Sequence, residues 1–285
     1  MRRIDYIVRE EDGGKTVEKI LRSHEYSTTI IKRQKLLGDG MLLNGARART
    51  VDKVREGDTV SVCLHEESAR SVPNPALSCD IVYEDEDVIV FDKPARMATH
   101  ETKVYQTDTL ANFFAFHMQK KGMSAPFRAV NRLDKDTMGL CVAAKNALCA
   151  SKLAGKIYKE YLAVLSGRLE VSDGEIVQPI AQESGSIIKR CVSPSGQYAK
   201  TVFKVERVFE DRTLVRVWPE TGRTHQIRLH FACIGHPLVG DWLYGFETPQ
   251  NKTQLLCCDT VSFIHPVSGE KITCKSALSG TLLLF

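Results

Sequence analysis

Residues 131–139 read Asn-Arg-Leu-Asp-Lys-Asp-Thr-Met-Gly, and residues 222–228 read Gly-Arg-Thr-His-Gln-Ile-Arg. The first stretch puts the carboxylate of Asp134 just after a basic residue, where the chain leads into an apolar run typical of a strand. The second stretch repeats arginine at positions 223 and 228. An acidic group and a guanidinium from such distant segments indicate a site in which a buried charge needs a fixed partner.

Apolar and β-branched runs surround these two stretches. They predict strands at residues 80–83, 88–91, 139–143, 161–165 and 213–218, and helices at residues 107–120 and through Leu148 and Leu153. Strands of mixed type with interspersed helices predict an α+β domain over residues 79–285.

The first 64 residues predict a separate small module. Apolar residues at helical spacing predict a helix over residues 16–24, and Ser27 or Thr28 can cap a second helix that ends before Gly38. A strand over residues 41–43, a tight turn at Asn44 and Gly45, and a strand over residues 59–63 follow. Residues 65–78 lack periodicity and contain two prolines, which predicts a linker to the larger domain.

The charge of the chain is distributed unevenly. Over 285 residues the net charge is only +4, and the fractions of hydrophobic (43%) and charged (26%) residues are ordinary for a globular protein. From Lys19 to Arg55, however, nine lysines and arginines stand against three acidic residues. Such a stretch is most often a solvated face, and its other interpretation is contact with nucleic-acid phosphates.

The nine cysteines are scattered and contain no Cys-x-x-Cys pair. This usage predicts buried, reduced thiols, and neither a zinc ribbon nor a disulfide framework. No apolar run approaches the ~18 residues of a membrane span, and the first residues lack the apolar run of a signal peptide. We therefore expect a cytoplasmic protein that does not enter a membrane.

The first 64 residues resemble the S4-like RNA-binding domain in the order of their predicted elements. In that family the second helix and the following turn present basic residues to RNA. The matching positions here are Lys32, Arg33, Lys35, Arg47 and Arg49. The alternative interpretation is a small structural cap whose surface carries ion pairs.

Four segments of the larger domain resemble, in order, the motifs of the RluA-type pseudouridine synthases, which isomerise uridine within RNA. These segments are Tyr83-Glu84-Asp85 with Lys93-Pro94 and His100, then residues 131–137, then residues 159–163, and finally residues 221–228 with Gly235-His236-Pro237 and Gly240-Asp241. Any one of them could arise by chance, whereas four in the family's order indicate a member of the family. The resemblance implies a mixed, largely antiparallel sheet flanked by helices.

The resemblance implies that Asp134 is the catalytic carboxylate, acting as a nucleophile at the sugar or as a base on it. Because the reaction breaks a glycosidic bond and rejoins the uracil through carbon, it needs no cofactor and no metal. The carboxylate must be ionised in a dry pocket, where desolvation would raise its pKa, and Arg228 carries over as the partner that favours the charged form. Tyr161 carries over as the aromatic that stacks on the uracil, although core packing is the simpler interpretation from sequence alone.

Five further residues are expected to bind or surround the substrate. Arg132 would fill the gap left by the target base, because the glycosidic carbon of a stacked nucleotide cannot be reached. Arg223 and Gln226 would hold the pocket wall or a phosphate. Leu256 would form an apolar floor, and Lys93 belongs to the first motif.

Three departures from the family pattern lie beside these positions. Asn131 stands in place of the usual His, Met138 in place of Ser, and Cys257-Cys258 in place of His-Ala. They bear on the choice of substrate more than on activity. A metal site is not expected at His225, His230 and His236, because their spacings do not keep them on one helical face.

We therefore expect a monomeric enzyme that forms pseudouridine in structured RNA. Large-subunit (23S) ribosomal RNA is favoured, since family members with an S4-like module often act on it, and transfer RNA is the alternative substrate. Two other functions stay open: a non-catalytic RNA-binding or ribosome-assembly factor, and a hydrolase. The hydrolase would use Asp134 and Asp136, on one face of an extended segment, as an acid/base pair on a glycosidic bond.

Overall fold

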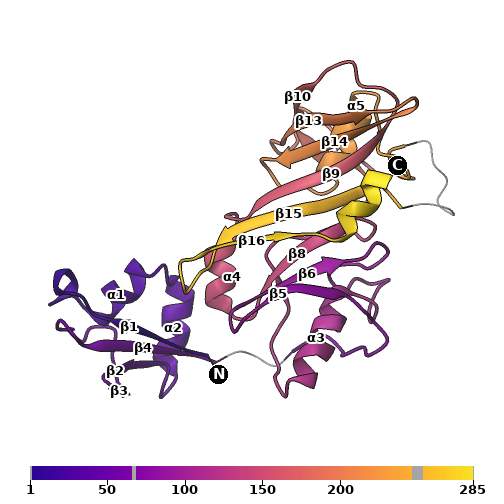
Figure 1. Cartoon of the computed structure of the whole chain (residues 1–285). Coiled ribbons are helices and arrows are strands. Elements are labelled where there is room, and N and C mark those ends of the chain that lie inside the picture. Colours follow the sequence, from indigo (N-terminus) through magenta and orange to yellow (C-terminus); the bar gives the residue numbers. More distant parts are fainter. Residues whose placement is uncertain (1, 66–68, 246–252, 285) are drawn as a thin grey trace.

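The N-terminal module contains a four-stranded sheet in the order β1-β4-β2-β3 and two helices. The computed structural model describes residues 2–65, 69–245 and 253–284 (Figure 1). The elements of the module are β1 (Arg2–Ile7), the short 3-10 helix η1 (Glu10–Asp12), α1 (Val17–Ser23), α2 (Thr28–Leu36), β2 (Met41–Leu43), β3 (Ala46–Arg47) and β4 (Thr59–Leu64). Both helices were predicted, whereas β1, which pairs with β4, was not.

Local sequence explains these elements. Thr16 and Ser27 cap the two helices, because their hydroxyl oxygens accept from the backbone N–H groups of Lys19 and Ile30. The hairpin turn between β2 and β3 requires positive φ at both central residues, and Asn44 (51°) and Gly45 (82°) supply it.

The larger domain is built on a ten-stranded sheet in the order β10-β13-β14-β9-β15-β8-β6-β5, with β16 paired to β15 and β7 paired to β8. The strands are β5 (Asp80–Glu84), β6 (Val88–Lys93), β7 (Arg128–Ala129), β8 (Met138–Ala144), β9 (Tyr158–Ser166), β10 (Asp173–Val177), β13 (Lys200–Val208), β14 (Arg212–Pro219), β15 (Leu256–Ile264) and β16 (Lys271–Lys275). A separate pair joins β11 (Ile180–Gln182) to β12 (Arg190–Val192), and the helices are α3 (Leu110–Lys120), α4 (Ala147–Leu153), α5 (Gln226–Cys233) and the 3-10 helix η2 (Leu278–Leu284). The predicted α+β fold with a mixed, largely antiparallel sheet is confirmed.

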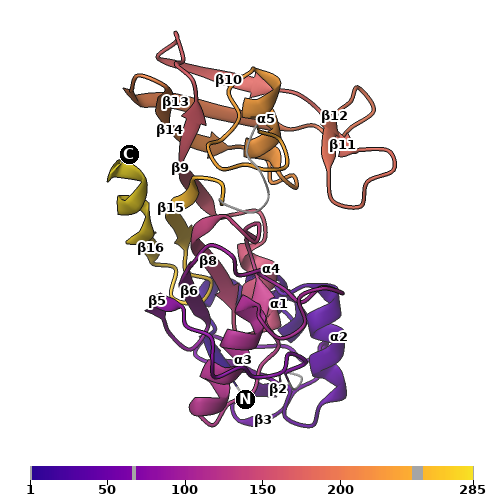
Figure 2. The same cartoon turned by 90° about the vertical axis from the view of Figure 1, so that its right-hand side faces the viewer.

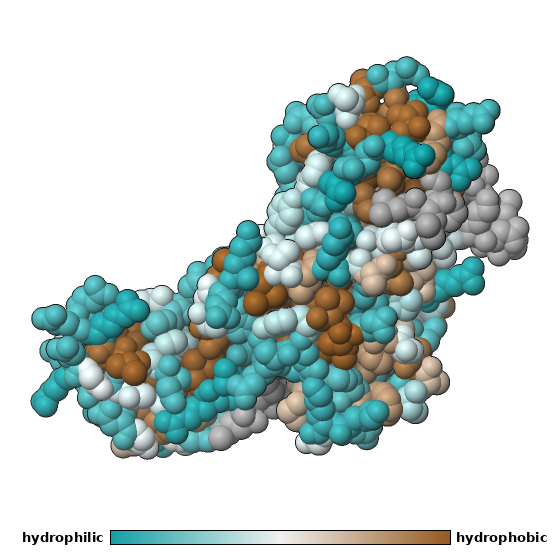
Figure 3. Space-filling view, in the orientation of Figure 1, coloured by the Kyte–Doolittle hydropathy of each residue, from teal (hydrophilic) through white to brown (hydrophobic). Residues whose placement is uncertain are grey.

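Different helices lie beside the two ends of this sheet. Figures 1 and 2 show α3 and α4 beside the end formed by β5, β6 and β8, and α5 beside the end formed by β10, β13 and β14. Strands β9 and β15 cross between the two ends. On the face shown in Figure 3, hydrophilic residues cover much of the N-terminal module, and hydrophobic residues gather over the middle of the molecule and its far end.

The pairing of β15 with β8 is the parallel contact in this sheet, and it aligns Cys257 with Met138 and Cys258 with Gly139. Gly139 has a φ of +99°, and a Cβ atom there would lie 2.3 Å from the carbonyl oxygen of Cys258. Only glycine permits this approach. It brings the loop before β8 next to β15, and β15 in turn pairs with β9.

The module touches the larger domain at several points. Leu148 of α4 belongs to the same buried apolar cluster as Val17 and Leu21 of α1. Arg2 Nη2 donates to Asp87 Oδ2 at 2.9 Å. Both apolar packing and an ion pair therefore hold the module against the larger domain.

The predicted linker, residues 65–78, contains no helix or strand at residue 65 or over residues 69–78, and residues 66–68 lie outside the described part of the chain. It follows α3 rather than crossing open solvent, since Asn112 Nδ2 donates to the Val72 carbonyl oxygen (2.9 Å) and Asn74 Nδ2 to that of Thr107 (2.7 Å).

All nine cysteines are free thiols. Six are buried and two are half-buried, whereas Cys233 is exposed, an exception to the predicted burial. Nowhere in the described ranges does a helix combine the length and apolar character that a membrane span requires.

Candidate active site

Asp134 lies in the loop between β7 and β8, at the first position of a tight turn. The N–H of Thr137 closes this turn by donating to the Asp134 carbonyl oxygen (3.1 Å), with Lys135 and Asp136 in the middle. The segment from Asp134 to Asp136 is therefore not extended, and the geometry expected for a hydrolase pair is wrong.

Two side chains fix the backbone that precedes Asp134. Asn131 Nδ2 donates to the Leu140 carbonyl oxygen (3.0 Å), and its Oδ1 accepts from the N–H of Val142 (2.8 Å). Thr99 Oγ1 donates to the carbonyl oxygen of Leu133 (2.7 Å) and accepts from its N–H (3.2 Å). Asn131, a departure from the family pattern, therefore anchors the loop to β8.

Arg228, on α5, donates to two carboxylates. Its Nη1 donates to Asp134 Oδ2 at 3.0 Å, while Nε and Nη2 donate to the two oxygens of Asp241 at 2.7 and 2.8 Å. Burial by itself would lower the pKa of Arg228, but the hydrogen bonds that Arg228 donates to Asp241 and the charge of Asp134 outweigh burial and raise the pKa above its ordinary value. The expected pair of Asp134 and Arg228 is thus present, with a permanently charged guanidinium.

Asp241 is a functional candidate that the sequence analysis quoted in the last motif without giving it a role. Its side chain is fully buried, and Oδ1 also accepts from the backbone N–H groups of Leu243 (3.0 Å) and Tyr244 (3.2 Å). The sequence offered one signal, because an acid among apolar residues needs a cationic partner, and Arg228 precedes it by 13 positions.

His225 and Tyr244 form another side of the site. His225 stands before α5 with a φ of 57°, its Nδ1 is 2.9 Å from the Tyr244 hydroxyl, and its Nε2 is 3.8 Å from Asp134 Oδ2. Burial is the main cause that lowers the pKa of His225, so its imidazole is neutral at pH 7. The Tyr244 ring lies 5.3 Å from the Arg228 guanidinium. The cation beside Asp134 is therefore Arg228.

Tyr161 lies on β9 opposite Cys258 of β15 and is 7% exposed. Burial, then the neighbouring Cys258, raises its pKa well above the ordinary value, and the charge of Asp134 acts in the same direction. The phenol is therefore protonated and can donate a hydrogen bond. Leu256, expected as an apolar floor, is buried in the same cluster as Tyr161.

Two expected substrate-binding residues require correction. Lys93 is fully buried, and its Nζ donates to the carbonyl oxygens of Pro94 (2.9 Å), Met97 (2.8 Å) and Lys135 (3.1 Å). Burial lowers its pKa to about 8. These hydrogen bonds use all three N–H groups of the ammonium, so the prediction that Lys93 contacts a substrate directly is wrong. Lys93 instead connects β6 to the turn that begins at Asp134.

Gln226 is 4% exposed, and its amide is fully used inside the protein. Nε2 donates to the Lys200 carbonyl oxygen (2.9 Å) and to Thr201 Oγ1 (3.0 Å), and Oε1 accepts from Thr221 (2.7 Å) and from the N–H of Arg223 (3.0 Å). Gln226 therefore belongs to the wall of the site and does not hold a phosphate. Arg132 and Arg223 are both exposed, and Arg223 Nε donates to the Tyr198 carbonyl oxygen (3.0 Å).

The basic residues of the N-terminal module differ in exposure. Lys32, Lys35, Arg47 and Arg49 are exposed. Arg33 is half-buried, and its Nη2 donates to the His65 carbonyl oxygen (3.0 Å). Four of the five expected RNA-binding side chains therefore face solvent.

Within the described ranges, no group of three or more His, Cys, Asp and Glu side chains is arranged to hold a metal ion.

Comparison of the whole chain with known proteins identifies its relatives. A family model described as RNA pseudouridylate synthase matches residues 87–233. An uncharacterized RNA pseudouridine synthase of Bacillus subtilis, YhcT, is 34% identical, over 96% of this chain and 93% of the relative. A ribosomal large subunit pseudouridine synthase D of Yersinia pestis is 36% identical, over 95% of this chain and 90% of the relative. Its counterpart in Xanthomonas campestris is 33% identical, with coverage of 93% and 86%.

Among solved structures, human RNA pseudouridylate synthase domain containing 1 has a similar fold. Its TM-score is 0.58 at 24% identity, and the match covers 72% of this chain and 85% of the human one. At this identity the likeness concerns the fold alone.

Proposed function

The chain belongs to the RluA/RluD-type family of RNA pseudouridine synthases, and on that premise we propose that it modifies large-subunit ribosomal RNA with Asp134 as its catalytic carboxylate. It is an enzyme, an isomerase that forms pseudouridine in RNA. The substrate and the residue roles are the proposal.

The contact of Asp134 with Arg228 carries this proposal. Asp134 keeps 27% of its side chain exposed, whereas Arg228 is 5% exposed. The carboxylate can therefore meet a ribose from the open side while a fixed guanidinium stands behind it. A charge-assisted hydrogen bond of this kind favours the ionised carboxylate, which either proposed role requires.

The chemistry fits a site made of side chains alone. The N1–C1′ bond of uridine breaks, a C5–C1′ bond forms, C5 loses a proton and N1 gains one, so atoms and electrons balance. Asp134 would attack C1′ or remove a proton from the sugar. Tyr161, held protonated by burial, would donate a hydrogen bond to the base or supply a proton late in the reaction.

The target base must leave its stack before Asp134 can reach the sugar. Arg132 is exposed and lies two residues before Asp134 in the same fixed loop. Its guanidinium is planar and can stack on bases. It would therefore occupy the gap that the extruded uracil leaves.

The names of the relatives and the basic module support ribosomal RNA as substrate. Two relatives with 33% and 36% identity are named for the ribosomal large subunit. The module, S4-like by sequence, would add phosphate contacts through the exposed residues Lys32, Lys35, Arg47 and Arg49, and the half-buried Arg33 would add positive charge beside them.

Pseudouridine mapping tests this proposal in cells. Strains that lack the gene should lose specific pseudouridines from large-subunit ribosomal RNA. Wild-type protein should restore them, and Asp134→Asn should not. Loss confined to transfer RNA would contradict the substrate, and restoration by Asp134→Asn would contradict the role of the carboxylate.

A further inference from the structure

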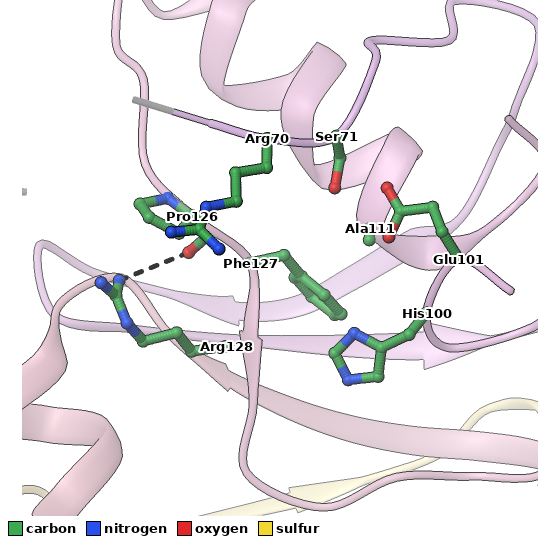
Figure 4. A pocket seen from close by; sticks show the side chains of 8 residues that line it. All are labelled: Arg70, Ser71, His100, Glu101, Ala111, Pro126, Phe127 and Arg128. Atoms are coloured by element: carbon green, nitrogen blue, oxygen red, sulfur yellow. Dashed lines mark hydrogen bonds between the residues drawn. The ribbon is translucent and has the colours of Figure 1, made fainter. Parts of the chain in front are cut away.

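A polar pocket lies beside the loop that carries Asp134, and nothing in the reaction described above uses it. Its volume is about 360 Å³. Figure 4 shows the lining residues, which are Arg70, Ser71, His100, Glu101, Ala111, Pro126, Phe127 and Arg128. This volume lies within the ~300–1,000 Å³ typical of sites for small organic groups.

The pocket adjoins the catalytic loop through the backbone. His100 directly follows Thr99, whose hydroxyl makes both hydrogen bonds to Leu133, the residue before Asp134. The charge of Arg132 acts on His100, although burial is the larger cause that lowers the pKa of this imidazole. The pocket therefore lies close to the residue that would replace the target base.

The pocket combines an aromatic platform with two cations. The Phe127 ring packs against that of Phe114, at 5.4 Å between centroids, and its centroid lies 5.1 Å from that of His100. Arg70 comes from the linker, and Arg128 from the start of β7, where its Nη1 donates to the Pro126 carbonyl oxygen (3.4 Å). Flat rings beside guanidinium groups are the side chains that bind single-stranded nucleotides.

We infer that this pocket binds a nucleotide of the substrate RNA that neighbours the target uridine. The base lies against Phe127 and His100, and Arg70 and Arg128 contact the adjoining phosphate. Glu101 adds an acceptor, which favours a base with an amino group, such as cytosine. This inference rests on the proposed function, since it needs an unstacked RNA strand at Asp134.

Part of the pocket is formed by the linker between the two domains. Arg70 and Ser71 lie in the segment that joins the N-terminal module to the larger domain, and the neighbouring Val72 is held by Asn112. The pocket would therefore read the RNA between the module and the catalytic loop. Sequence preference next to the target uridine would arise here rather than at Asp134.

Synthetic RNA hairpins test the inference. Each carries a uridine that the cellular mapping identifies, and a single abasic nucleotide replaces one neighbour at a time. With wild-type protein, one abasic position should raise Kd about 5- to 150-fold, the range expected for losing one stacked base. With Phe127→Leu or His100→Ala, the same abasic position should have little further effect.

The arginines are tested by the double variant Arg70→Gln/Arg128→Gln, which should raise Kd and KM roughly tenfold or more. Arg207→Gln is the control, because Arg207 is exposed, as Arg70 is, and its guanidinium lies 4.8 Å from the centroid of an aromatic ring, that of Phe209. Thermal unfolding of each variant verifies the fold, and His100→Ala serves if Phe127→Leu is unstable.

Equal responses of wild-type, Phe127→Leu and His100→Ala proteins to every abasic position would overturn the inference. So would a double variant that binds like Arg207→Gln. Failure of the wild-type protein to form pseudouridine in the intact hairpin would instead contradict the proposed function.

Discussion

Arg228 donates hydrogen bonds to two carboxylates, and it donates more of them to Asp241 than to Asp134. Asp241 receives two hydrogen bonds from it, is fully buried and accepts two more from the backbone, whereas Asp134 receives one and keeps an open side. Asp241 therefore sets the position of the guanidinium. Asp134 is left free to act on the ribose.

Replacing Asp241 with Asn tests this division of roles. The variant keeps the size of the side chain but removes its charge, so the free energy of unfolding should fall by about 1.5–3 kcal/mol. A misplaced Arg228 should also lower kcat about 100- to 1,000-fold, the range found when one preorganised donor is lost. Calorimetry and turnover of ribosomal RNA transcripts measure the two effects.

Asp211→Asn is the matched control. Asp211 also receives two hydrogen bonds from an arginine, Arg212, but on the surface (2.8 and 3.2 Å). Surface pairs contribute little, so neither stability nor kcat should change measurably. A wild-type kcat in Asp241→Asn would show that Asp241 does not position Arg228.

Single residues show where sequence reasoning reaches its limit. The pairing of Asp134 with Arg228 was predicted from the resemblance of the two motifs to the family's, and it agrees with the need of a buried charge for a fixed partner. Lys93 lies in a motif too, but its burial is invisible in the sequence, and the ammonium bonds to backbone rather than to RNA. A charge in a motif therefore does not reveal whether it faces a ligand.

The position of the active-site loop depends on the parallel pairing of β8 with β15. Gly139→Ala forces a Cβ to 2.3 Å from the Cys258 carbonyl oxygen at a positive φ. Strain and overpacking together should lower the free energy of unfolding by about 2–6 kcal/mol and reduce activity in step. Chemical denaturation with parallel turnover assays measures this.

Gly155→Ala separates the effect of backbone strain on stability from the effect of overpacking. Gly155 also has a positive φ (+72°), but nothing lies within 4 Å of its Cβ position. Its cost should be only ~1–2 kcal/mol, from backbone strain alone. Equal losses in the two variants would mean that close approach to β15 is unimportant.

Glu84 joins three elements and makes stability depend on pH. Burial would raise its pKa, but hydrogen bonds from Lys121, Lys145 and His117 outweigh it and hold the pKa at about 2. Because the folded-state pKa is depressed, the stabilisation is complete above the ordinary value near 4.5 and is lost as pH falls toward 2.

Glu84→Gln should therefore flatten the acid limb of the stability curve. The difference in unfolding free energy between wild type and variant should shrink by about 2–3 kcal/mol between pH 6 and pH 2. Urea titrations across this range measure it. A difference that stays constant with pH would contradict the ionic role of Glu84.

At the scale of elements, the sequence predicts what local physics determines. The cap at Ser27 and the turn at Asn44 are both read from adjacent residues, whereas the cap at Thr16 was not predicted. Helix α5 was not predicted, because it is buried on several sides, shows no polar stripe and follows a residue in the left-handed region without a side-chain cap. Strand order depends on contacts between distant residues, which the sequence does not display.

For the whole molecule, the module and the larger domain act on one RNA in our proposal. Changing Lys32, Lys35, Arg47 and Arg49 to Gln removes four exposed cations from the module. If each contacts a phosphate, the slope of log K against log salt should become less steep by about 2.8–3.6, because each contact contributes ~0.7–0.9. Filter binding over a range of salt concentrations measures it.

A matched quadruple variant controls for net charge. Arg168, Arg207, Lys271 and Lys275 are also exposed, but they belong to the larger domain. Their change to Gln should leave the slope nearly as it is. The same slope in both variants would mean that the module is only a structural cap.

Single-turnover pseudouridine formation by Asp134→Asn, with RNA binding measured on the same protein, shows whether Asp134 is the catalytic carboxylate. The variant keeps the shape of the side chain and its contact with Arg228 but has no carboxylate to act on the ribose. We predict binding close to that of the wild type and no pseudouridine above background. Pseudouridine formation at the wild-type rate would contradict the assignment of Asp134.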